Sequence, residues 1–136
     1  MAFVNVYYHN LDSKNRLFIP VRFRDQLGER FYIMPGPDES LFVYPEETFN
    51  EIAEQYRKTH RDLDAQTAFY SNVSEATVDN QGRVSLDVRH VQHSGLTKEV
   101  AVIGSGRRVV IKPLEKFKIS EVKTSEAIDF TEDIDW

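Results

Sequence analysis

The sequence contains one pattern twice, and this duplication limits the possible folds more than any other feature of the chain. The first copy reads HNLDSKNRLFIPVRFRDQLG at residues 9–28, and the second reads EATVDNQGRVSLDVRHVQHSG at residues 75–95. At a spacing of 67 residues the identical pairs are Asp12 and Asp79, Arg16 and Arg83, Val21 and Val88, Arg22 and Arg89, and Gly28 and Gly95. After one inserted residue the pairs continue as Gly36 and Gly104, Pro45 and Pro113, Glu47 and Glu115, and Phe49 and Phe117. We therefore predict that one structural unit occurs twice in the chain.

Each copy is predicted to consist of short strands and one short helix. The strands are expected at residues 4–11, 16–19, 30–34 and 41–44 of the first copy, and at residues 75–78, 83–86, 99–103 and 108–112 of the second. Pro20 opens the first helix, where its missing N–H does no harm, and Gly28 closes it. The second helix is expected at residues 87–94, and the apolar run at residues 100–103 is expected to be buried on both sides. The predicted fold class is therefore mainly β with short helices.

The patterns divide the chain into four parts. We predict a first half at residues 1–49, a helical linker at residues 50–73, a second half at residues 74–118 and an acidic tail at residues 119–136. The linker starts with apolar residues at helical spacing, interpreted as a packing face rather than a ligand site: Phe49, Ile52, Ala53 and Tyr56. A second linker helix is expected at residues 63–72. The tail accounts for the whole net charge of −5, and its composition favours disorder, with docking on a neighbouring subunit as the alternative.

Composition excludes several classes of protein. Without cysteine the chain has no disulfide and no thiolate metal site. Only His90 and His93 of the four histidines are close in sequence, and we expect both at the surface without a bound metal. No apolar run approaches the roughly 20 residues that cross a bilayer, and the N-terminal residues lack the pattern of a signal peptide. These features predict a cytoplasmic protein with no membrane partner.

Motifs of enzymes and of cofactor-binding folds do not occur in the sequence. Patterns of the GxSxG, HExxH, P-loop and GxGxxG kinds are all missing. The short segment at residues 104–106 lies between two predicted strands, so it is interpreted as a hairpin turn rather than a phosphate-binding loop. We therefore expect no catalytic residues, no cofactor and no small-molecule substrate.

The repeated Asp-x-x-x-Arg pattern is the candidate site. It reads DSKNR at residues 12–16 and DNQGR at residues 79–83. An aspartate at the start of a turn accepts backbone N–H bonds, and an arginine four residues later pairs with it. Asp12 and Asp79 are therefore predicted to hold the two turns in shape.

Basic residues gather around the first of these turns. Lys14, Arg16, Arg22 and Arg24 fall within eleven residues, and the apolar residues between them fix this stretch to the core. A basic cluster on a rigid turn suits DNA phosphates, and arginine also reaches guanine O6 and N7. The alternative for Arg22 and Arg24 is that they are ordinary solvated charges on a short helix. The second turn carries fewer basic residues, so the prediction that it contacts DNA is weaker.

These motifs resemble those of the MraZ family. The paired segments DSKNRLFIP and DNQGRVSL, the central LFVYPEETF and the later GLTKEVAVIG agree with it in order and spacing over residues 3–118. The resemblance implies a tandem, single-chain form of the AbrB-type swapped-hairpin β-barrel, in which Lys14, Arg16 and Arg83 carry the family's DNA-binding function. The residues that depart from the family pattern are Asn15, Phe18 and Asp87. Asparagine tolerates the left-handed conformation and aspartate caps helices, so the fold is expected to persist.

The same resemblance implies a role in transcription. Family members form closed rings and repress the bacterial division and cell-wall gene cluster, which includes their own gene, by binding repeated promoter boxes. We therefore expect a sequence-specific DNA-binding repressor that acts as a homo-oligomeric ring at the nucleoid. Two alternatives remain open at this point: an AbrB-type antitoxin or transition-state regulator, and a ring-forming interaction protein that binds no DNA.

Overall fold

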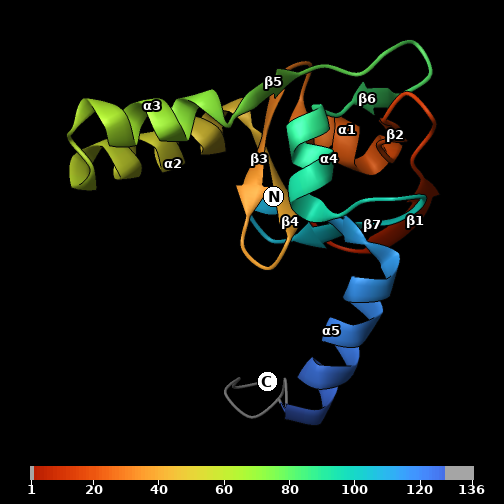
Figure 1. The fold of residues 1–136 in the computed structure, drawn as a ribbon. Helices are drawn as coiled ribbons and strands as arrows, with labels where there is room; N and C mark the ends of the chain where they lie inside the picture. The colour runs from red at the N-terminus through yellow and green to blue at the C-terminus, as the bar shows by residue number, and fades with distance from the viewer. Residues whose placement is uncertain (1, 128–136) are drawn as a thin grey trace.

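The computed structural model of the chain describes residues 2–127. The strands are β1 (Val6–Asn10), β2 (Arg16–Phe18), β3 (Phe31–Gly36), β4 (Ser40–Pro45), β5 (Ser74–Ala76), β6 (Arg83–Ser85), β7 (Glu99–Ser105) and β8 (Arg108–Pro113). The helices are α1 (Val21–Leu27), α2 (Glu46–Thr59), α3 (Leu63–Ser71), α4 (Val88–Ser94) and α5 (Leu114–Ala127). Each half therefore has the order β-β-α-β-β-α, and α3 lies between the halves (Figure 1).

The two halves exchange strands within one antiparallel sheet. Its order is β1-β7-β8-β4-β3-β5, and β2 and β6 form a separate two-stranded ribbon. β1 pairs with β7 of the second half, where Val6 lies opposite Ile103, and β5 pairs with β3 of the first half, where Ala76 lies opposite Phe31. This exchange confirms the predicted duplicated, swapped-hairpin class. The sheet does not close into a barrel within residues 2–127, because its edge strands β1 and β5 each lead into the ribbon instead of pairing with one another.

One hydrophobic core joins the six-stranded sheet to the ribbon and to α1. Leu17 of β2 lies opposite Val84 of β6, and both side chains are fully buried. Phe23 of α1 is also buried and meets Phe3 and Tyr7 edge-on, with ring centroids 5.8 and 5.2 Å apart. Burying side chains of this size stabilises the fold by about 1.5–3 kcal/mol each. Because side chains alternate along a strand, the residues next to Leu17 and Val84 form the outer face of the ribbon.

The duplication extends further than the identical residues indicate. α2 (Glu46–Thr59) and α5 (Leu114–Ala127) both contain 14 residues and both directly follow a strand that ends in proline. The two helices are therefore counterparts in the two halves. The predicted division of the chain into four parts stays a prediction, although α2 and α5 continue across its first and last boundaries. Residues 119–127 of the predicted acidic tail belong to α5, and residues 128–136 lie outside the described residues.

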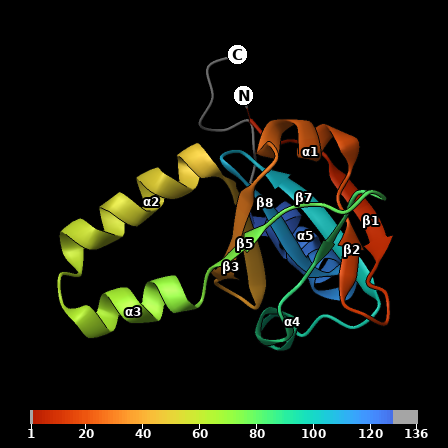
Figure 2. The same cartoon turned by 90° about the horizontal axis from the view of Figure 1, so that it is seen from above.

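The linker helices pack through aromatic rings. α2 and α3 form a pair that projects from the sheet (Figures 1 and 2). Phe49 stacks on Tyr32 of β3 with ring centroids 4.3 Å apart, and Phe69 of α3 stacks on Tyr56 at 4.5 Å. These contacts confirm that the aromatic stripe of the linker is a packing face. Across residues 2–127, none of the helices combines the length and the apolar character that a membrane span needs.

One histidine does not lie where the sequence predicted it. His93 is exposed as expected, whereas only 2% of His90 is exposed. His90 lies on the same face of α4 as the buried Ser94, and its Nε2 atom is 2.7 Å from the carbonyl oxygen of Asn72. The prediction was wrong for His90 because the close spacing of the two histidines said nothing about which face of the helix turns inward. Residues 2–127 contain no group of three or more side chains that is arranged to hold a metal ion.

Candidate nucleic-acid interface

The first Asp-x-x-x-Arg turn is closed by its own backbone. The N–H of Asp12 donates to the carbonyl oxygen of Arg16 at 3.0 Å, and the N–H of Asn15 donates to the carbonyl oxygen of Asp12 at 3.0 Å. Asn15 has a φ of 58°, the left-handed conformation that asparagine adopts more readily than most residues. The turn therefore forms with Asn15 in place, as expected.

The carboxylate of Asp12 holds this turn and its arginine together. Oδ1 accepts the backbone N–H of Lys14 at 2.9 Å and that of Arg16 at 2.8 Å, while Oδ2 accepts Nε of Arg16 at 2.7 Å. The bond from the Arg16 N–H is the main cause that lowers the pKa of Asp12, and the Arg16 side chain lowers it further. Asp12 is therefore ionised at neutral pH and fixes the position of the Arg16 guanidinium. This is the turn-holding geometry predicted for Asp12.

Asp79 repeats the arrangement in the second turn. Its Oδ1 accepts the backbone N–H groups of Gln81 and Arg83, each at 2.9 Å, and its Oδ2 accepts Nε of Arg83 at 3.0 Å. The bond from the Arg83 N–H is again the main cause that lowers the pKa of Asp79. Gly82 occupies the left-handed position, with a φ of 78°. The two turns thus share one backbone frame.

The ribbon connects each turn to the opposite half. β2 and β6 pair antiparallel over three residue pairs. Just beyond β2, the N–H of Ile19 donates to the carbonyl oxygen of Gly82 at 2.9 Å. Just beyond β6, the N–H of Leu86 donates to the carbonyl oxygen of Asn15 at 2.9 Å. Each helix that follows the ribbon therefore begins beside the turn of the other half.

The bases of the two turns differ in how firmly they are held. Lys14 is exposed, and its ammonium group forms no ion pair within residues 2–127. Arg16 is tied to Asp12, and Arg83 is tied to Asp79. Nη1 of Arg83 also lies 3.6 Å from Oδ2 of Asp12, so the second turn is linked to the first. The structure thus places two oriented arginines and one unpaired lysine around the ribbon.

The two predicted site residues of α1 have different surroundings. Nε of Arg24 donates to the carbonyl oxygen of Ile19 at 2.9 Å, and its guanidinium carbon lies 5.3 Å from the centre of the Phe18 ring. The same group packs on Gly82, where an added Cβ would lie 2.8 Å from the guanidinium carbon. Arg24 therefore braces the second turn, with Phe18 beneath it. Arg22 is exposed and forms no ion pair in the described part of the chain.

The sequence reasoning missed one basic residue of this surface. Arg89 is the counterpart of Arg22, and the bond from Leu86 to Asn15 brings the start of α4 beside the first turn. Asp87 caps α4 as expected, because its Oδ1 accepts the N–H of Arg89 at 2.8 Å, and its Oδ2 lies 3.1 Å from Nη2 of Arg89. The spacing of 67 residues, applied to Arg22, is the signal that identifies Arg89 from the sequence.

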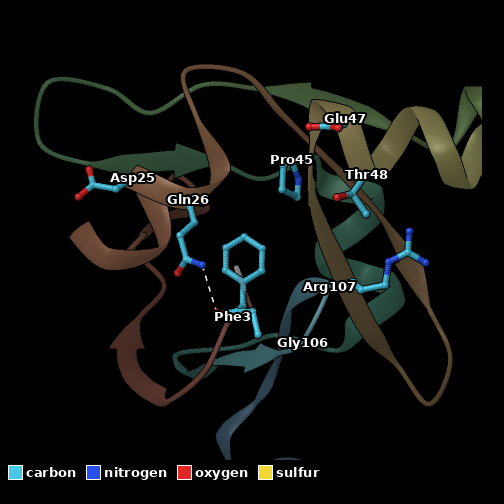
Figure 3. A pocket seen from close by; sticks show the side chains of 9 residues that line it. Phe3, Asp25, Gln26, Pro45, Glu47, Thr48, Gly106 and Arg107 are labelled. Atoms are coloured by element: carbon cyan, nitrogen blue, oxygen red, sulfur yellow. Dashed lines mark hydrogen bonds between the residues drawn. The ribbon is translucent and has the colours of Figure 1, made fainter.

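An open hollow lies between the N-terminal segment, α1, the start of α2 and the β7–β8 turn (Figure 3). The side chain of Gln26 donates to the carbonyl oxygen of Ala2 at 3.2 Å across one side of it. Its lining includes the carboxylates of Asp25 and Glu47, but no hydroxyl of the lining residues is hydrogen-bonded to a base. The hollow therefore presents no activated nucleophile.

The fold and the turns together define the class of this protein, a duplicated swapped-hairpin β protein with two aspartate-anchored turns. The sequence matches the family described as "MraZ protein, putative antitoxin-like" twice, over residues 2–72 and residues 69–134. The chain belongs to the MraZ family, and the predicted resemblance is confirmed.

Several relatives carry the name Transcriptional regulator MraZ. The relative from Finegoldia magna is 41% identical over an alignment of 120 residues, which covers 85% of this chain and 84% of the relative. The relative from Lactobacillus gasseri is 37% identical over an alignment of 138 residues, which covers 98% of this chain and 96% of the relative. The relative from Heliobacterium modesticaldum is 40% identical over an alignment of 119 residues, which covers 85% of this chain and 83% of the relative. This chain is accordingly a transcriptional regulator.

Proposed function

We propose that the chain binds double-stranded DNA sequence-specifically through the ribbon and its two turns. The observation that carries the proposal is the aspartate-fixed arginine in each turn, Arg16 and Arg83. In both side chains the hydrogen bond to aspartate is donated by Nε, and 30% of the Arg16 side chain and 27% of the Arg83 side chain stay exposed. A guanidinium that is already oriented loses little conformational freedom when it meets a base edge or a phosphate.

The other bases supply charge and support in this proposal. Arg16 reads a guanine edge or clamps a phosphate, and Arg83 does the same from the second turn. Lys14 and Arg22, which are exposed, neutralise phosphates and make the affinity dependent on salt. Arg24 acts through the second turn, which it braces at Gly82.

The proposal includes a ring of identical subunits on direct promoter repeats. One module with a few phosphate contacts binds weakly at physiological salt. Several modules joined in a ring meet successive repeats at a high effective concentration, which raises the joint affinity. Light scattering tests this step, because a ring has a mass that is a multiple of the 15.8 kDa subunit. A monomeric mass at the concentrations used for DNA binding would contradict it.

The regulated genes are proposed to be the bacterial division and cell-wall cluster, including the gene of this protein, with repression as the outcome. The protein then acts in the cytoplasm at the nucleoid, without a membrane partner, cofactor or small-molecule substrate. The alternative is an AbrB-type antitoxin or transition-state regulator. The chain carries both halves of the ribbon, so the two-turn surface is complete without a second chain.

Fluorescence anisotropy against DNA from upstream of the protein's own gene tests the proposal. A scrambled duplex of the same length is the control, and both are titrated between about 50 and 200 mM salt. We expect tighter binding to the native duplex and a steep loss of affinity with salt. Equal or negligible binding to both duplexes would overturn the proposal and favour a ring-forming interaction protein that binds no DNA.

A further inference from the structure

Two exposed valines occupy equivalent positions in the two halves. Val21 begins α1 and Val88 begins α4, 67 residues later. Their exposed fractions are 56% and 54%, whereas Leu17 and Val84 of the ribbon and Phe23 of α1 are buried. Each valine is followed by an arginine, Arg22 or Arg89. The same apolar residue is thus presented to solvent twice, beside the same cation.

The swapped ribbon places each valine beside the turn of the opposite half. The Leu86–Asn15 hydrogen bond of 2.9 Å holds the start of α4, and with it Val88, beside the first turn. The Ile19–Gly82 hydrogen bond of 2.9 Å holds the start of α1 beside the second turn in the same way. Figure 2 shows α1 and α4 on opposite sides of β2. The two valines therefore flank the proposed DNA-binding surface.

We propose that Val21 and Val88 contact the C5-methyl groups of thymines and are therefore specificity-determining residues. The inference rests on the proposed DNA binding. An exposed apolar side chain stabilises a complex only where it meets another apolar group and both lose contact with water. On the base edges of the major groove, the thymine methyl is that group.

The neighbouring charges determine which ligand comes to these valines. Lys14 and Arg22 are exposed without an ion pair in the described residues, and Arg89 is exposed beside Asp87. These cations bring phosphates to both sides of the ribbon, and each valine directly precedes one of the two arginines in the chain. A flat apolar partner would leave the cations without counterions, whereas a DNA groove offers phosphates at its rims and methyl groups on its floor. The two valines thus add thymine recognition to the guanine recognition proposed for the arginines.

Replacing thymine by deoxyuridine in the upstream duplex tests this inference, because it removes the methyl groups and leaves the hydrogen-bonding groups of the bases intact. Loss of one buried methyl contact corresponds to about a fourfold loss of affinity. We expect wild-type protein to bind the deoxyuridine duplex about fourfold more weakly for each contacted methyl. The double variant V21A/V88A is expected to bind both duplexes equally, at the affinity that wild type shows for the deoxyuridine duplex.

Val4→Ala is the matched control, because Val4 is 50% exposed and precedes β1, at the opposite end of that strand from the first turn, with its backbone against Gly104. This variant is expected to keep the full difference between the two duplexes. Equal binding of both duplexes by wild type, with the preference over scrambled DNA retained, would overturn the valine assignment alone. If wild type binds neither duplex, the proposed function fails together with this inference. A difference between the duplexes that persists in V21A/V88A would also overturn it.

Discussion

The two turns share a frame and differ in the charges that they carry. Asp12 and Asp79 make the same three hydrogen bonds, at distances between 2.7 and 3.0 Å. The first turn carries Lys14 where the second carries Gln81, and the second is the one that Arg24 braces. Both copies thus contain the geometry that fixes an arginine, while the unpaired charge is concentrated in one of them. In the proposed function both turns contact DNA through their arginines, and the first turn contributes more of the affinity because it also carries Lys14.

Replacing the arginine of each turn tests this difference, and it is expected to cause the largest change in DNA affinity. Arg16→Ala is expected to lower the affinity for the upstream duplex by about 5- to 150-fold, the range for one specific arginine contact. Arg83→Ala should have a smaller effect, since the second turn carries less charge. Anisotropy titrations measure both. Arg57→Ala, which removes an exposed arginine of α2, is the control, and an equal loss for all three variants would contradict the assignment.

The left-handed positions distinguish the two turns by stability. Gly82→Ala is expected to lower the free energy of unfolding by about 1–2 kcal/mol, because an L-residue is strained at positive φ. The new Cβ would also push Arg24 away from the turn. Asn15→Gly, the reciprocal change, should alter stability by less than about 0.5 kcal/mol. Urea unfolding of both variants measures the difference, and a neutral Gly82→Ala would show that Arg24 does not brace the turn.

Exchanging the charge between the turns sharpens the comparison. Lys14→Gln is expected to weaken binding by about threefold and to lower the salt slope by about one, as loss of one phosphate contact does. Gln81→Lys, which gives the second turn the cation of the first, should raise the slope by about one if that turn lies as close to the phosphates. The salt dependence of anisotropy reports both slopes. An unchanged slope for Gln81→Lys would mean that only the first turn contacts the backbone.

Lowering the pH should destabilise the protein through both turns alike, and this is the smallest of the expected effects. The folded pKa values of Asp12 and Asp79 are lowered, chiefly by the backbone N–H groups of Arg16 and Arg83. Groups of this kind contribute stability that is fully present above their unfolded pKa, about 3.9, and is lost as the pH falls through the folded value. The thermal midpoint should therefore decrease below about pH 4. In Asp12→Asn this acid-dependent decrease should be smaller, and an identical decrease would exclude Asp12 as a contributor.

Sequence patterns predicted the elements of each half but not how the halves join. The apolar run at residues 100–103 is buried as predicted, except that Ile103 is only half-buried. Local spacing does not reveal that β1 pairs with β7, because that pairing joins residues 89 to 97 positions apart in the chain. The resemblance to the family supplied that expectation. α5 was not predicted because its apolar residues, such as Phe117 and Ile119, do not follow a single helical face.

The candidate site was also predicted only in part, because some of its contacts join residues that are distant in the sequence. The turns follow from a local pattern, so the roles of Asp12 and Asp79 in holding them were accessible from the sequence alone. Contacts across the ribbon, such as the packing of Arg24 on Gly82, were not accessible from the sequence alone. Which side of a short helix faces the interior also depends on distant partners, which explains the error at His90.

The exchange of strands has a consequence for protein synthesis. β1 is translated well before β7, the strand to which it pairs. A nascent chain or a fragment that ends before β6 therefore lacks the partner strands of both β1 and β2, and its sheet edges stay open to proteases and aggregation. Only a chain that extends through β7 has both turns and the paired sheet in place. If the protein regulates its own gene, such feedback responds to the number of finished molecules rather than to the number of translation starts.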